Sequence, residues 1–148
     1  MEAKKTYKVF RYENDVSWES GRKGTLYSPG KPDLTVSSPP EFKGEAGFWT
    51  PEEMLVASVN ACTLMTFVAF AQHKGLELAS YESDAEGVLE NVEGKYRFTE
   101  ITLHPHVRVK ALEDIERARK ILEDAHANCF VSNSLSLPVK VFPQFSVA

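Results

Sequence analysis

The longest apolar stretch of the chain, residues 50–75, reads TPEEMLVASVNACTLMTFVAFAQHKG. Thr50 is a typical helix N-cap, Pro51 suits the first helical position, and Glu53 follows three residues after the cap. Residues 54–71 carry no charge, and a glycine ends the run after a polar, basic turn. The stretch therefore predicts one long helix that is apolar on nearly every side.

The surroundings of this helix are the next question. Residues 54–71 reach the lower length limit for a membrane span, but Ser58, Asn60, Thr63 and Thr66 dilute them. No second span or signal accompanies them, so we favour a buried helix in a protein without membrane contact. A helix that is apolar all round must be covered on all sides, and a chain of 148 residues has little material to surround it. We therefore expect a second copy to cover part of it, which makes a homodimer.

Composition limits the class of protein. A length of 148 residues suits a single domain over residues 1–148, with 43% hydrophobic and 26% charged residues. Lys and Arg total 17 against 21 Asp and Glu, which leaves no basic excess for nucleic acid or an anionic membrane. The start, MEAKKTYKVF, has no apolar signal region, so a cytoplasmic location is expected. Two cysteines are too few for a secreted disulfide scaffold.

Strands are expected on both sides of the long helix. Before it, β-forming residues between turn residues predict strands at 5–12, 22–28 and 33–37, then a loop over 38–47. After it, two long strands at 77–89 and 96–109 flank a hairpin turn at 91–95, and a second helix covers 112–127 before strand character at 137–147. This order predicts an α+β fold with sheets packed on the central helix.

The two cysteines can be interpreted as packing residues of the core or as reactive thiols. Cys62 lies in the middle of the long helix, where a small buried hydrophobe is the simplest reading. That position gives no help from the helix dipole, so a reactive Cys62 would need a nearby cation. Cys129 follows the second helix in an exit loop, where a thiol is more mobile and less naturally a packing residue, although the packing interpretation stays open. A zinc site with His126 lacks the paired ligand spacing of such sites.

Two motifs resemble those of a known family. Residues 51–62, PEEMLVASVNAC, and 129–135, CFVSNSL, resemble the two cysteine motifs of the OsmC/Ohr family, named for osmotically inducible protein C and the organic hydroperoxide resistance protein. Residues 21–24, GRKG, fall where that family places an active-site arginine. The chain departs from the pattern at Thr50, where asparagine is usual, and at Phe130, where proline is common. The order of elements also matches, so the resemblance covers nearly the whole chain.

The resemblance implies a fold and an assembly as well as an activity. The fold would be OsmC/Ohr-like, with antiparallel sheets packed around the long central helix in an intertwined homodimer whose two sites lie between subunits. The activity would be that of a thiol-dependent peroxidase that reduces organic hydroperoxides, with inorganic peroxide left open as a second substrate.

The same resemblance assigns roles to residues. Cys62 would attack the O–O bond as a thiolate and become a sulfenic acid, and Cys129 would close a disulfide with it. Arg22 would stabilise the thiolate, since an opposite charge favours the ionised form, and Glu52 would orient Arg22. An external dithiol, a lipoyl group in some members, would restore both thiols. No metal or other cofactor is implied.

The spacing of Glu52 and Cys62 raises a difficulty. Ten residues on one straight helix separate them by about 15 Å. Sharing one arginine therefore needs either a break in the helix or the other subunit's copy. Without the resemblance, Arg22 reads as an exposed turn residue and Glu52 as an acid that suits the first turn of the helix.

Alternatives remain open at this point. Apolar side chains near the cysteine helix either form a pocket wall for bulky hydroperoxides or belong to the core; they are Phe48, Trp49, Met65, Phe67 and Phe70. The chain is alternatively a non-catalytic dimer of the same fold that binds a small apolar ligand at the subunit interface. A third hypothesis is an interaction protein whose cysteines only pack. The reactivity of the thiols distinguishes the first hypothesis from the other two.

Overall fold

A computed structural model of the chain describes residues 5–148. The chain divides into two compact units at the start of the long helix, with an N-terminal unit that ends at Pro51 and a C-terminal unit, Glu52–Ala148. The expectation of one domain over residues 1–148 stays a prediction.

The N-terminal unit is a small antiparallel sheet of three strands. The strands β1 (Asp15–Ser20), β2 (Lys23–Tyr27) and β3 (Leu34–Ser37) lie in that order, and a short 3-10 helix η1 (Pro40–Phe42) follows. The predicted strands at 22–28 and 33–37 are confirmed. The predicted strand at 5–12 is wrong, because these residues form no strand and their large apolar side chains are exposed. Strand propensity depends on a half-buried surface, and this segment has none.

A tight turn positions Arg22 between β1 and β2. Ser20 pairs with Lys23, so Gly21 and Arg22 form a two-residue turn. Gly21 has a φ of 51°, which glycine adopts without steric cost at the first position of such a turn. The Trp18 indole N–H donates to the Gly21 carbonyl at 2.9 Å and braces the turn.

The C-terminal unit combines a long hairpin with helices. The strands β4 (Leu78–Val92) and β5 (Lys95–Val109) pair in antiparallel fashion, and β6 (Val139–Val141) and β7 (Gln144–Val147) both pair with β5 in parallel. The helices are α1 (Pro51–His73), α2 (Ile115–Ala127) and the short α3 (Phe130–Asn133), with a 3-10 turn η2 (Leu112–Asp114) before α2. The expected helices, hairpin and tail strands are confirmed, as is the α+β class.

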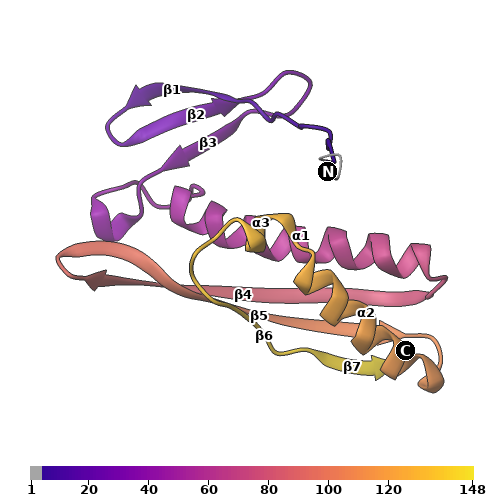
Figure 1. The fold of residues 1–148 in the computed structure, drawn as a ribbon. Coiled ribbons are helices and arrows are strands. Elements are labelled where there is room, and N and C mark those ends of the chain that lie inside the picture. The colour runs from indigo at the N-terminus through magenta and orange to yellow at the C-terminus, as the bar shows by residue number, and fades with distance from the viewer. Residues whose placement is uncertain (1–4) are drawn as a thin grey trace. The chain divides into compact units, whose positions relative to one another are not determined.

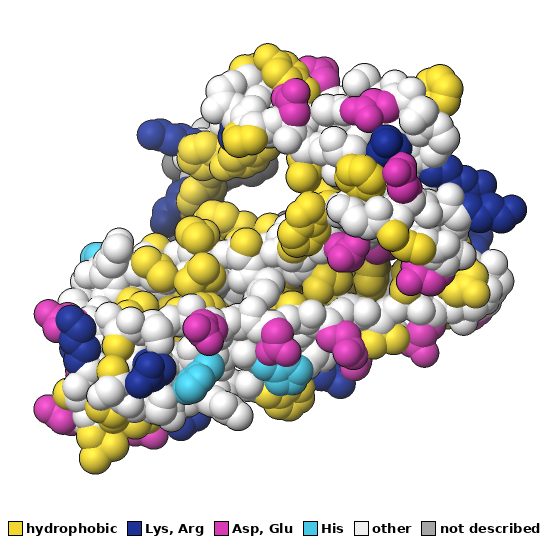
Figure 2. All heavy atoms as spheres, turned by 180° about the vertical axis from the view of Figure 1, so that it is seen from behind, with side chains coloured by type: hydrophobic (Ala, Val, Ile, Leu, Met, Phe, Trp, Pro, Cys, Tyr) yellow, Lys and Arg dark blue, Asp and Glu magenta, His cyan; other side chains and the backbone are white. Residues whose placement is uncertain are grey.

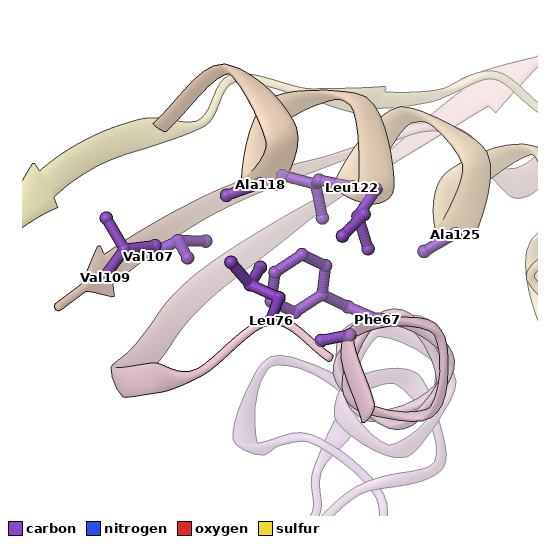
Figure 3. Close-up of a cluster of buried hydrophobic side chains, with 9 residues drawn as sticks. Phe67, Leu76, Val107, Val109, Ala118, Leu122 and Ala125 are labelled. Atoms are coloured by element: carbon purple, nitrogen blue, oxygen red, sulfur yellow. The ribbon is translucent and has the colours of Figure 1, made fainter. Parts of the chain in front are cut away.

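One face of the sheet carries both longer helices. Alternate residues of β5 are fully buried, and α1 and α2 pack on this face (Figure 1). Phe67 of α1 lies at the centre of the larger cluster, between β5 and α2 (Figure 3). A smaller cluster joins Val59 of α1 to Ile101 and Leu103 of β5. Cys62 lies between Val59 and Phe67 in the sequence, so the core fixes the helix on both sides of it.

The helix α1 is covered unevenly. Its buried residues recur every four positions, at Val59, Thr63, Phe67 and Ala71, and face the sheet. Met65 on another face is 62% exposed. By length and composition α1 would pass as a membrane span, but a core helix passes the same test, and this helix packs on a sheet. The helix is therefore apolar beyond the face that the sheet buries.

Candidate functional site

The fold brings Cys62 and Cys129 together. Cys62 projects from α1, and Cys129 lies between α2 and α3. Thr63, the residue after Cys62 on α1, has its hydroxyl 3.9 Å from the Cys129 sulfur, and Cys62 is among the groups that lower the pKa of the Cys129 thiol. Both are free thiols. The two cysteines therefore lie near each other, and their pairing and catalytic role stay predictions.

The two thiols differ in access. Cys62 is half-buried, whereas Cys129 is fully buried. Of the two interpretations of Cys129, its full burial favours the packed one; Cys129 directly precedes α3, and its carbonyl accepts a hydrogen bond from the backbone N–H of Asn133 at 2.9 Å. A small reagent from solution would thus meet Cys62 first.

Hydrogen bonds favour the ionised form of Cys129. Burial raises the pKa of its thiol, but hydrogen bonds from the hydroxyl and backbone N–H of Ser132, from Cys62 and from Thr63 lower it. The net effect holds the pKa of Cys129 below its ordinary value. The Ser132 hydroxyl oxygen is buried and has no hydrogen-bond partner within residues 5–148. Its proton is therefore not committed to another acceptor.

Two threonines of α1 frame the thiols. The Thr66 hydroxyl donates to the Cys62 carbonyl at 2.8 Å and lies 4.0 Å from the Cys62 sulfur. The Thr63 hydroxyl donates to the Val59 carbonyl at 2.9 Å and faces the Cys129 sulfur. The sequence analysis missed Thr63 and Ser132. No local signal in the sequence marks either residue, because their place near Cys129 depends on how α1 and α3 pack.

The contacts of Arg22 and Glu52 do not test their predicted roles. Arg22 lies exposed on the turn of the N-terminal unit, where its guanidinium donates to the Phe42 carbonyl at 2.8 Å. Glu52 stands in the first turn of α1, and its Oε2 is buried with no hydrogen-bond partner in the described part of the chain. The helix runs unbroken from Pro51 to His73. A break that would bring Glu52 to Cys62 is therefore absent, and the roles of Arg22 and Glu52 stay predictions.

The predicted pocket wall is partly core. Phe67 is fully buried and Phe70 packs against the same cluster, so neither lines a surface beside Cys62. Met65 is exposed, one helical turn after Cys62. Phe48 and Trp49 belong to the N-terminal unit, and their part in a wall stays a prediction.

The zinc alternative needs a group of ligand side chains around the thiols. Within residues 5–148, no three His, Cys, Asp or Glu side chains are grouped so that they could hold an ion. The zinc alternative therefore has no ligand set in this part of the chain.

A separate hollow of about 660 Å³ lies on the sheet face away from α1. It is lined by Glu82, Ser83, Asp84, His104, His106, Phe142 and Gln144. Figure 2 shows histidine and acidic side chains gathered along this side of the C-terminal unit. It contains no thiol, so it is distinct from the cysteine pair.

Comparisons with known proteins identify a family. The family model described as OsmC-like protein matches residues 44–142, which is more than half of the chain. The uncharacterized protein YmaD of Bacillus subtilis (strain 168) is 26% identical over 137 residues, covering 89% of this chain and 91% of its own length.

Solved structures show the same fold. An OsmC-like protein of unknown function from Vibrio cholerae matches with a TM-score of 0.83 and 24% identity, covering 91% of this chain and 99% of its own. An organic hydroperoxide resistance protein OsmC from Legionella pneumophila matches with a TM-score of 0.66 and 25% identity, covering 93% and 97%. The resemblance read from the two cysteine motifs is confirmed, and the chain belongs to the OsmC-like protein family.

Proposed function

We propose that the protein is a cysteine-based hydroperoxide reductase. The observation that carries the proposal is a pair of free thiols linked by one neighbour, since Thr63 follows Cys62 and contacts the Cys129 sulfur at 3.9 Å; Cys62 is half-buried and Cys129 fully buried. Membership of a family that includes proteins named for organic hydroperoxide resistance supports it. A reachable sulfur beside a shielded one suits a two-step reaction better than it suits simple packing.

The reaction balances with the two sulfurs alone. The Cys62 thiolate attacks one peroxide oxygen, the O–O bond breaks, and the alkoxide leaves and takes up a proton to give an alcohol. Cys62 is then a sulfenic acid. The Cys129 sulfur attacks the Cys62 sulfur, the S–O bond breaks, and the hydroxide leaves as water after protonation. An external dithiol reduces the disulfide by exchange, for which we propose a lipoyl-type dithiol and no bound cofactor.

A cation is still required beside Cys62, since a mid-helix thiolate gains little from the helix dipole. We assign this role to Arg22 and its orientation to Glu52, whose orphaned buried oxygen needs a donor. Because α1 is unbroken, one arginine that serves both Glu52 and Cys62 must take one of them from the partner subunit. The proposed active site is therefore shared by two copies in a homodimer.

The exposed side of α1 supports this assembly and the substrate class. Ser58, Ala61, Met65 and Ala69 recur at helical spacing and are exposed. This strip is apolar or small throughout, and it flanks Cys62. It would pack against a second copy and offer an apolar surface to an organic hydroperoxide. We place the protein in the cytoplasm, where thiols are kept reduced.

The experiment treats the reduced protein with one equivalent of cumene hydroperoxide and follows free thiols and intact mass. The expected product has lost both thiols and two hydrogen atoms, with peptide mapping that shows a Cys62–Cys129 link. Cys62→Ser should abolish peroxide consumption. Cys129→Ser should consume one equivalent and then gain further oxygen at Cys62, because no thiol resolves the sulfenic acid.

A control separates catalysis from general thiol chemistry. Arg22→Ala should slow the first oxidation by roughly tenfold or more, and Arg22→Lys should recover part of the rate because it restores the charge but not the planar fork. Unchanged thiols after several minutes with peroxide would contradict the proposal. That outcome would favour the alternative of a non-catalytic dimer that binds a small apolar ligand.

A further inference from the structure

The surroundings of Cys129 go beyond what a disulfide partner requires. A buried sulfur that only packs needs no polar neighbours, yet the Thr63 hydroxyl lies 3.9 Å from the Cys129 sulfur. The Ser132 hydroxyl, on the turn that begins at Cys129, is buried and has no hydrogen-bond partner in residues 5–148. An unpaired buried hydroxyl is unfavourable, and an ionised Cys129 sulfur three residues before it would give it an acceptor.

The turn that carries Ser132 is held in place by its own hydrogen bonds. The backbone N–H of Asn133 donates to the Cys129 carbonyl at 2.9 Å, and the Asn133 side chain donates to the Ala127 carbonyl at 3.2 Å. The backbone N–H of Leu135 donates to the Ser132 carbonyl at 3.2 Å. Ser132 is therefore fixed beside Cys129 rather than free to turn away.

Thr63 has one hydroxyl proton and two acceptors. It donates to the Val59 carbonyl at 2.9 Å, and its oxygen lies 3.9 Å from the Cys129 sulfur. While the proton stays on the Val59 side, the Thr63 oxygen can accept the thiol proton of Cys129. Once Cys129 is ionised, rotation of the same hydroxyl turns its proton to the sulfur. Thr63 can thus stabilise both protonation states of Cys129.

We propose that Ser132 and Thr63 are positioning residues that prepare Cys129 as the attacking thiolate in the step that closes the Cys62–Cys129 disulfide. This inference rests on the proposed function. In that step the Cys129 thiolate forms the S–S bond, the bond from the Cys62 sulfur to its leaving group breaks, and the leaving group departs with the electron pair. With the sulfenic acid the leaving group is hydroxide, and the hydroperoxide is the oxidant that formed it.

The experiment isolates this step from peroxide chemistry. Dithiobis(nitrobenzoate) first converts the reachable Cys62 to a mixed disulfide and releases one thionitrobenzoate. Attack by Cys129 then releases the second, and its visible absorbance gives the closing rate directly. Ser132→Ala and Thr63→Val should each slow closing at neutral pH by roughly tenfold, the loss expected for one hydrogen bond to a charged group.

Matched variants distinguish the loss of a hydroxyl group near Cys129 from a general disruption of the local structure. Ser132→Thr and Thr63→Ser keep a hydroxyl at each position and should restore most of the rate. Ser134→Ala serves as the control on the same turn, because the Ser134 hydroxyl donates to the Phe130 carbonyl at 2.7 Å and not to the sulfur. It should close at the parent rate.

A pH titration of the Cys129 thiol separates the two roles, because a residue that only supports the fold would leave the titration midpoint unchanged. In a Cys62→Ser background, which keeps a donor at position 62, the ultraviolet absorbance of the thiolate reports Cys129 alone. Ser132→Ala and Thr63→Val should move its midpoint to higher pH. Unchanged midpoints, or equal slowing in Ser134→Ala, would overturn the inference. Normal closing rates and midpoints in a protein that ignores peroxide would instead contradict the proposed function alone.

Discussion

Gly87→Ala tests how closely the cysteine helix rests on the sheet. Gly87 lies within β4 and its φ is not positive, so its backbone accepts any residue. A Cβ atom there would lie 2.5 Å from Cγ2 of Val56 on α1 and 2.9 Å from Cε1 of Phe98 on β5. Valine is stiff at χ1, so its methyl group cannot swing aside cheaply. The helix or the Phe98 ring must therefore move.

Two effects of this substitution oppose each other. Alanine restricts the conformations of the unfolded chain, which raises the free energy of unfolding by about 0.4–1 kcal/mol. Overpacking a tight contact in the folded protein lowers it by about 1–3 kcal/mol. Overpacking should win, because the contact is far below an ordinary separation and involves a stiff side chain. We expect a net loss of about 1–2 kcal/mol in the free energy of unfolding.

The assay is urea unfolding of the parent, Gly87→Ala, Val56→Ala and the double variant. Helical circular dichroism is the suitable probe, because both tryptophans, Trp18 and Trp49, belong to the N-terminal unit. Removing the Val56 methyl groups opens the space that the new Cβ needs, so Gly87→Ala should cost less in that background. Equal costs in both backgrounds, or a Gly87→Ala protein as stable as the parent, would refute the reasoning.

Three further substitutions test the core, a buried phenol and the exposed side of α1. Phe67→Ala empties the centre of the cluster in Figure 3 and should lower the free energy of unfolding by about 3–5 kcal/mol in urea; a loss below 1 kcal/mol would show that the cluster is not packed as described. Burial raises the pKa of Tyr81 from 10.0 to about 12, so the neutral phenol stabilises the fold below pH 10 and this contribution disappears as the pH rises towards 12. Tyr81→Phe should therefore weaken the loss of stability over that pH range, and an identical profile would contradict this. Met65→Lys should leave the fold intact, since Met65 is 62% exposed, but halve the molar mass measured by light scattering, whereas Gln72→Lys on the same helix should not.

The parts of the fold that follow from local signals could be predicted. Thr50 and Pro51 mark the start of α1, and Gly94 marks the hairpin turn, where Glu93 and Gly94 both have positive φ. The strand predicted at 5–12 failed because its residues resemble a strand but have no strand partner among residues 5–148. The strand β1 was missed although Val16 and Trp18 alternate with polar residues in it, and all six of its residues are exposed.

The candidate site was predictable only through the two motifs taken together. Periodicity placed Cys62 on α1 but said nothing of Cys129, and no local rule indicates that two distant thiols meet. The sequence left Cys129 open between a mobile and a packed thiol because the exit from α2 was read as a loop, whereas α3 begins directly after Cys129 and the sulfur is fully buried. Contacts of Ser132 and Thr63 with that sulfur depend on how α1 and α3 lie in space, which hydrophobic patterning does not report.

The thiol whose pKa is lowered, Cys129, is not the thiol that solvent reaches, which is Cys62. Burial alone would keep Cys129 protonated, but its hydroxyl and backbone donors reverse that effect and hold its pKa below the ordinary value. Thiolates react with oxidants faster than thiols, so acidity favours Cys129, yet Cys129 is fully buried while Cys62 is half-buried. The order of oxidation is then set by exposure, with Cys62 first. Limited alkylation followed by peptide mapping tests this, since a bulky maleimide should label Cys62 well before Cys129 in the folded protein. Earlier labelling of Cys129 would show that acidity, and not access, decides which sulfur reacts.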